Sequence, residues 1–202
     1  MFRPFAFLFF LLLSSPAISA EKIILVFGDS LSAGFGLAVH QSWPALLDQY
    51  LKQSGSQYAV ANASISGETT AGGKARFAAA LTQFKPAVVI IALGANDGLR
   101  GLPIAAMREN LSVMATAAKK NNARVLLVGM RLPPNYGAKY TQEFEQAFID
   151  IAKRERLALL PFLLEPFAAE RNAFQADALH PTAVAQPRIL HHVLTQLKPL
   201  LK

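Results

Sequence analysis

The chain has 202 residues, no cysteine and a formal net charge of +7 at pH 7. The lack of cysteine excludes disulfides, thiol catalysis and cysteine-bound metal. The basic residues are not interleaved with aromatic residues in the runs that bind nucleic acid, so the charge indicates a generally basic surface and no nucleic-acid partner.

The first 20 residues have the pattern of a secretory signal peptide. Arg3 precedes an apolar run over residues 5–13, and residues 14–20 supply small side chains for a cleavage site near Ala20. The run is shorter than the about 20 apolar residues that cross a bilayer, and no later stretch qualifies. We therefore expect a periplasmic or secreted protein with one folded domain at 21–202. Arg3 is the only charged residue that cleavage removes, so the net charge of this domain is +6.

Five short apolar segments alternate with helical patterns along the rest of the chain. The first covers residues 22–27, where Gly28 ends it and Ser30 follows. The clearest segment, residues 87–93, is a continuous apolar run of the kind that is buried on both faces of a parallel sheet. The complete set of expected strands is 22–27, 58–63, 87–93, 124–130 and 157–162.

Amphipathic or alanine-rich helices are expected between these strands. The helix that starts at Ser42, with Pro44 at an early position, should end at Gly55, and Thr182 should cap the last helix. The other helices are expected from about 70 to 84, from 103 to 122 and from about 140 to 151. This alternation predicts a single α/β domain with a doubly wound parallel sheet and helices on both faces.

Polar residues follow four of the five expected strands. They are Ser30, Gly67, Asn96 and, after the last strand, Asp177 and His180. Because right-handed crossovers bring the carboxyl ends of parallel strands to one edge of the sheet, we expect these residues to lie together. The set contains a nucleophile, a base, a group that orients the base and donors for an oxyanion. These are the parts that acyl transfer needs.

In this interpretation Ser30 attacks a carbonyl carbon, His180 takes its proton and Asp177 fixes the imidazole tautomer. The spacing of three residues between Asp177 and His180 lets the two side chains meet within one tight turn. The alternative for Ser30 is that it and Asp29 only cap the following helix. The alternative for His180 is an ordinary surface position beside a helix.

The other histidines fit the role of base less well. His191 and His192 fall inside an amphipathic pattern, and His40 has no acidic residue close in sequence. His180 is therefore the strongest candidate base. Of the acidic residues near the strand ends, Asp29, Glu68 and Asp97 are expected to be structural hydrogen-bond partners.

The expected oxyanion donors are the backbone N–H groups of Ser30 and Gly67 and the side-chain amide of Asn96. Gly67 would let the backbone approach a substrate closely because it has no side chain. Ordinary turn chemistry is the alternative for Gly67 and Asn96. Neither a dinucleotide fingerprint, nor a P-loop, nor the G-x-S-x-G elbow is present around Ser30.

These residues stand in blocks that resemble the GDSL esterases of the SGNH hydrolase superfamily, in particular a bacterial periplasmic branch of acyl-CoA thioesterases, lysophospholipases and arylesterases. The resemblance covers the whole chain after residue 20. The blocks are GDSLSAGFGL from Gly28, NASISGETT from Asn62, GANDGLRG from Gly94, RLPPNYG from Arg131 and DALHP from Asp177.

The resemblance implies a flavodoxin-like three-layer α/β/α domain with a five-stranded parallel sheet, no cofactor and no metal. It also implies the same residue roles: Ser30, Asp177 and His180 as the catalytic triad, with Ser30, Gly67 and Asn96 as the oxyanion hole. The resemblance to that branch further implies that the loop at residues 131–137 shifts over bound acyl chains.

We therefore expect an exported serine hydrolase, most simply a monomer, that cleaves acyl esters and thioesters such as acyl-CoA, lysophospholipid and aryl esters. One alternative is a small-ester or carbohydrate deacetylase or arylesterase. A second alternative is a lipid-binding protein without catalysis. Apolar residues in the loops above the strand ends are expected to line an acyl groove. They are Phe35, Leu37, Leu99, Leu102, Pro133, Pro134 and Tyr136.

Overall fold

The computed structural model describes residues 21–201, so the predicted signal peptide lies outside the described residues. Its centre is a sheet of five parallel strands in the order β2-β1-β3-β4-β5, which is the flavodoxin-like order. The strands are β1 (Lys22–Gly28), β2 (Tyr58–Asn62), β3 (Val88–Ala92), β4 (Arg124–Val128) and β5 (Ala158–Leu160). The predicted fold class is confirmed.

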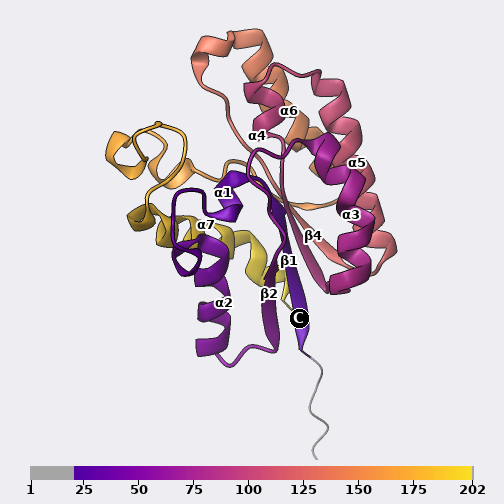
Figure 1. Cartoon of the computed structure of the whole chain (residues 1–202). Helices are drawn as coiled ribbons and strands as arrows, with labels where there is room; N and C mark the ends of the chain where they lie inside the picture. The colour runs from indigo at the N-terminus through magenta and orange to yellow at the C-terminus, as the bar shows by residue number, and fades with distance from the viewer. Residues whose placement is uncertain (1–20, 202) are drawn as a thin grey trace, which may run out of the picture.

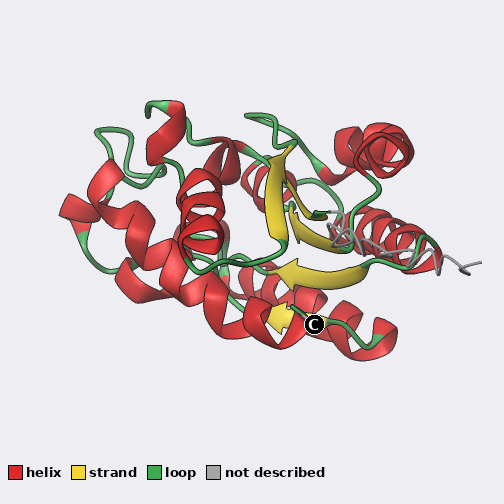
Figure 2. Ribbon diagram, turned by 90° about the horizontal axis from the view of Figure 1, so that it is seen from below, coloured by secondary structure: helices red, strands yellow, loops and turns green. Residues whose placement is uncertain are grey.

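Helices cover both faces of the sheet, as Figures 1 and 2 show. One face packs against α2 (Trp43–Gln53) and α7 (Gln186–Leu197). The other packs against α3 (Thr70–Phe84), α5 (Ile104–Lys120) and α6 (Ala138–Glu155). The strands are therefore covered on both sides, which gives the three layers that were expected.

The alternation of side chains along each strand divides the interior into two cores. Ile24 and Val88 belong to the core under α2 and α7, whereas their neighbours Leu25 and Val89 belong to the core under α3, α5 and α6. All four side chains are fully buried. Since both faces must be apolar, such strands read as unbroken hydrophobic runs, and this is why β1 and β3 were visible in the sequence.

Two short helices at the carboxyl edge of the sheet were not predicted. They are α1 (Ser30–Ala33), directly after β1, and α4 (Ala95–Leu99), shortly after β3. Each is too short to show a helical period in the sequence. They matter because they set the position of Ser30 and of Asn96.

The chain after β5 differs most from the prediction. β5 has three residues instead of the expected six. Thr182 does not cap α7, because its hydroxyl donates to the carbonyl of Ala173 at 3.2 Å, and a 3₁₀ turn at Ala183–Ala185 precedes the helix. Two further 3₁₀ turns, Glu165–Phe167 and Arg171–Ala173, occupy the irregular segment. None of the helices within residues 21–201 has the length and apolar character needed to cross a membrane.

Candidate active site

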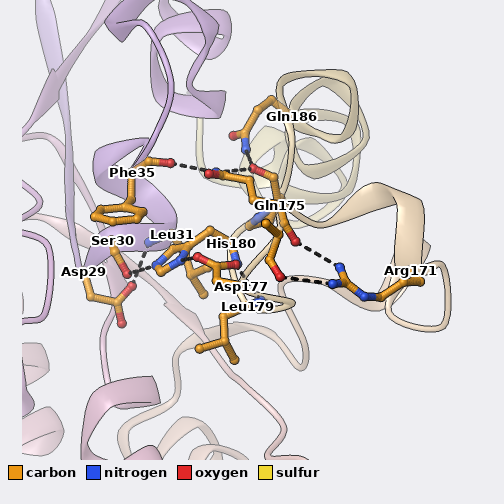
Figure 3. Close-up of polar contacts among 12 residues, drawn as sticks. Asp29, Ser30, Leu31, Phe35, Arg171, Gln175, Asp177, Leu179, His180 and Gln186 are labelled. Carbon is orange, nitrogen blue, oxygen red and sulfur yellow. Dashed lines mark hydrogen bonds and ion pairs between the residues drawn. The ribbon is translucent and has the colours of Figure 1, made fainter.

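Ser30 is the first residue of α1, immediately beyond the carboxyl end of β1. Asp29 caps this helix, since its carboxylate accepts a hydrogen bond from the N–H of Leu31 at 3.1 Å. Asp29 therefore caps the helix, as the alternative interpretation held, and Ser30 also stands at the end of a strand, as expected for a nucleophile. The Ser30 hydroxyl itself points away from the helix axis toward His180, with 2.9 Å between Oγ and Nε2 (Figure 3).

Asp177 and His180 lie in one turn between β5 and α7. The Oδ1 atom of Asp177 accepts from the N–H groups of Leu179 and His180 at 2.9 and 3.1 Å. Its Oδ2 atom lies 2.7 Å from Nδ1 of His180. Ala178 stands between them at φ 60°, a left-handed conformation that costs a residue with a Cβ some strain. The turn thus holds one carboxylate oxygen on backbone N–H groups and the other on the His180 ring.

The electrostatics of this turn favour an ionised Asp177. The N–H of Leu179, then the imidazole and N–H of His180, hold the pKa of Asp177 down to about 2. A carboxylate at Oδ2 keeps a proton on Nδ1 of His180, which leaves Nε2 free to accept the Ser30 hydroxyl proton. Ser30, His180 and Asp177 form a continuous row of hydrogen bonds.

Gly67 and Asn96 line the same cavity as Ser30 and His180. Gly67 has φ 78°, and its carbonyl accepts from the guanidinium of Arg100 at 2.9 Å. Asn96 is near the start of α4, where its side-chain amide donates to the carbonyl of Glu68 at 3.1 Å. The loop after β2 and the helix after β3 are therefore tied together beside Ser30.

A buried network holds α4 in place. The carboxylate of Asp97 accepts from the N–H of Thr70 at 2.8 Å and from its hydroxyl at 2.6 Å. The Thr70 hydroxyl in turn accepts from the amide of Asn110 at 3.1 Å. Because these groups are on α4, α3 and α5, Asp97 fixes the orientation of the neighbouring Asn96.

The site opens into a cavity of about 720 Å³. Four of the residues expected to line an acyl groove do line this cavity: Phe35, Leu99, Pro133 and Pro134. Leu37, Leu102 and Tyr136 are not among its lining residues, which corrects that part of the prediction. Tyr136 turns its hydroxyl to the carbonyl of Leu99 at 3.0 Å, and Leu102 is 37% exposed between the turn that follows α4 and the start of α5.

Much of the apolar wall was missed by the sequence analysis. It comes from the ends of β4 and β5 and from the irregular segment after β5. The missed apolar residues are Leu31, Ala95, Met130, Leu132, Phe162, Leu164, Ala168, Phe174, Ala178 and Leu179. The sequence signal for this wall was the apolar content of 157–168. Apolar composition does not distinguish a residue that packs in the core from one that lines a cavity.

The buried Asp29 is the second unusual acid of the site. It is 2% exposed, and burial raises its pKa from 3.8 to about 6, although the Leu31 N–H, the charge of His180 and the Asn96 amide act in the opposite direction. In the unfolded chain the carboxyl regains its ordinary pKa. The contribution of Asp29 to stability is therefore full below about pH 4 and is lost as the pH rises through 6.

Asp29→Asn should remove this pH dependence. We compare the free energy of unfolding of the variant with that of the wild type at each pH. The difference, variant minus wild type, should be about 2–3 kcal/mol larger at pH 8 than at pH 4. Urea unfolding of both proteins at pH 4, 6 and 8 measures the difference. The lowered pKa of Asp177 changes stability with pH in the opposite direction, but it does so in both proteins and cancels in the comparison. A difference that stays constant with pH would show that Asp29 is ionised as easily in the folded protein as in water.

A parallel α/β/α sheet with a Ser–His–Asp row at its carboxyl edge is the arrangement of a serine hydrolase. The model of the GDSL-like Lipase/Acylhydrolase family matches residues 26–186. The chain therefore belongs to this family, and the resemblance seen in the sequence blocks is confirmed.

Similar proteins carry related activities in their names. Esterase TesA of Pseudomonas aeruginosa is 49% identical over 183 residues, which are 91% of each chain. Thioesterase 1/protease 1/lysophospholipase L1 of Escherichia coli K12 is 40% identical over 96% of this chain and 91% of its own length. A crystal structure of the psychrotrophic esterase EstA from Pseudoalteromonas, inhibited by monoethylphosphonate, superposes with a TM-score of 0.86 at 38% identity, covering 90% of this chain and 99% of EstA.

Proposed function

We propose that this esterase cleaves acyl esters and thioesters through an acyl-enzyme formed on Ser30. The observation that carries the proposal is the hydrogen-bonded row in which His180 lies 2.9 Å from Ser30 and 2.7 Å from Asp177. The hydroxyl, the imidazole and the carboxylate have the separations that proton transfer requires before substrate enters.

The reaction proceeds in two halves. Ser30 Oγ attacks the carbonyl carbon of the substrate while His180 Nε2 accepts its proton. The tetrahedral intermediate collapses, the alcohol or thiol leaves with that proton, and the acyl group remains on Ser30. Water then attacks the acyl-enzyme, giving its proton to His180, which passes the proton to Ser30 Oγ as the bond to the acyl group breaks and the fatty acid leaves. Asp177 stabilises the imidazolium in both halves.

The oxyanion is held by the N–H groups of Ser30 and Gly67 and by the Asn96 amide. Three features support this assignment. Ser30 is at the N-terminus of α1, Gly67 has no side chain to block its backbone, and the Asp97 network fixes α4 beneath Asn96. Donors that are already oriented stabilise the intermediate without reorganisation during the reaction.

The cavity supports acyl chains as the substrate class. Its wall is largely aliphatic and aromatic, and a few polar groups, Ser30 and His180 among them, share it. The similar proteins named esterase and thioesterase/lysophospholipase support ester, thioester and lysophospholipid substrates. A preference for small or carbohydrate esters fits such a wall less well. We also propose that the protein is exported by its first 20 residues and acts as a monomer.

Chain-length preference tests the cavity assignment. Leu99 is half-buried in the cavity wall, so Leu99→Trp should fill space that an acyl chain would occupy. We expect the ratio of kcat/KM for decanoyl over acetyl nitrophenyl esters to fall about tenfold or more, since each buried methylene contributes about 0.8 kcal/mol. Val113→Trp on the exposed face of α5 is the matched control. An unchanged ratio in the Leu99→Trp protein would place the acyl chain elsewhere.

A further inference from the structure

The segment that carries Asp177 and His180 is outside the central sheet. It forms a small antiparallel hairpin in which Phe174 pairs with Pro181, and the N–H of Gln175 donates to the carbonyl of His180 at 2.8 Å. Ser30, by contrast, is fixed to the end of β1. The hydrogen bond between Ser30 and His180 therefore depends on how the hairpin is held against the loop that follows α1.

The side chain of Gln175 connects these two parts. Its Nε2 atom donates to the carbonyl of Phe35 at 2.8 Å and to the carbonyl of Pro181 at 3.1 Å (Figure 3). Both partners are acceptors, so both N–H groups of the amide are needed. Phe35 follows α1, and Pro181 follows His180 directly. One side chain thus joins the loop beyond Ser30 to the backbone beside the base.

Gly36 and Phe35 lie against the Gln175 side chain and the His180 ring. Gly36 has φ 74°, and a Cβ there would lie only 2.3 Å from Oε1 of Gln175, so only glycine allows the approach. Phe35 places its ring 4.4 Å from the His180 ring at an angle of 35°. The carbonyl that Gln175 holds and the ring that packs on the imidazole belong to the same residue.

A second glutamine extends the connection to the helices. The amide nitrogen of Gln186 lies 3.5 Å from the same Pro181 carbonyl, and its oxygen accepts from the N–H of Trp43 at 3.0 Å. Gln186 is 1% exposed at the start of α7, and Trp43 begins α2. The hairpin is therefore fixed to the helical layer on one side, and on the other side Gln175 links it to Phe35 in the loop beyond Ser30.

We propose that Gln175 is a positioning residue that keeps His180 Nε2 within hydrogen-bond distance of Ser30 Oγ. The proposal rests on the proposed roles of Ser30 and His180. Without the Gln175 amide, the Phe35 loop and the hairpin can separate, and a shift of about 1 Å would break a bond of 2.9 Å. Misplacement of that size costs about 10²-fold in rate while leaving substrate binding in the cavity largely intact.

The test compares Gln175→Met and Gln175→Ala with the wild-type protein. Methionine has nearly the volume of glutamine but no donor, so it separates hydrogen bonding from packing. We measure kcat and KM for a nitrophenyl ester and the rate at which a phosphonate labels Ser30, each referred to folded protein by circular dichroism. Gln53→Ala, at the exposed end of α2 on the opposite edge of the sheet, is the matched control.

We expect kcat to fall roughly 10- to 100-fold in both Gln175 variants, with KM changed less than threefold and the labelling rate reduced in parallel. Wild-type kcat per folded molecule in the Gln175→Met protein would overturn the proposal, because packing alone would then explain the side chain. A loss confined to KM would also overturn it. If the wild type itself showed no Ser30-dependent hydrolysis, the proposed function would fail instead.

Discussion

Ser30→Ala should lower kcat for ester and thioester hydrolysis by about 10⁴-fold or more. The substitution removes the only atom that can form the acyl-enzyme and leaves the cavity, the sheet and the Asp177–His180 turn in place. Ser30 is only half-buried at the start of α1, so the free energy of unfolding should change little. The measurement is hydrolysis of nitrophenyl esters and acyl-CoA thioesters over a series of chain lengths, beside the wild type.

His180→Ala should have an effect of similar size, and the double variant should be no worse than either single one. The two residues act as a unit, since the hydroxyl that lies 2.9 Å from the imidazole is a poor nucleophile without it. A phosphonate should label the wild type at Ser30 and fail to label either variant. A wild type that bound acyl chains but neither hydrolysed esters nor reacted with the phosphonate would be a lipid carrier on a hydrolase fold.

Asn96→Ala should lower kcat by about 10²- to 10³-fold with little change in KM. The amide is used most strongly when negative charge develops on the substrate oxygen, so its loss weakens the transition state more than the bound substrate. Folding should survive, because Asp97 continues to hold α4 through Thr70. Steady-state kinetics with a medium-chain nitrophenyl ester separates kcat from KM.

Asn121→Ala is the matched control for Asn96, since Asn121 is an exposed residue at the end of α5, where its amide donates to the carbonyl of Ala117 in the same helix. Its kcat should equal that of the wild type. The amide of Asn96 also donates to the carbonyl of Glu68. A kcat within threefold of wild type for Asn96→Ala would assign the amide to that structural contact alone and leave the oxyanion to the backbone donors.

The sequence by itself determined the fold class and the alternation of the five strands with the long helices. Strands such as 87–93 are buried on both faces, and their apolar runs are visible without any knowledge of their neighbours. The sequence also indicated Ser30, Asp177 and His180 as the reacting set, because each follows a strand and the ends of parallel strands share one edge. The structure brings these three side chains into one hydrogen-bonded row.

Only the tertiary structure decided which apolar residues line the cavity and what holds the base in place. Leu164 and Phe174 face the cavity, whereas Leu37 and Tyr136 do not, and no period in the sequence separates the two pairs. Gln175 looked like any polar loop residue, since both of its acceptors are backbone carbonyls, one of them 140 positions away. Contacts between irregular segments depend on the relative positions of loops that are far apart in the sequence, and no local sequence pattern encodes those positions.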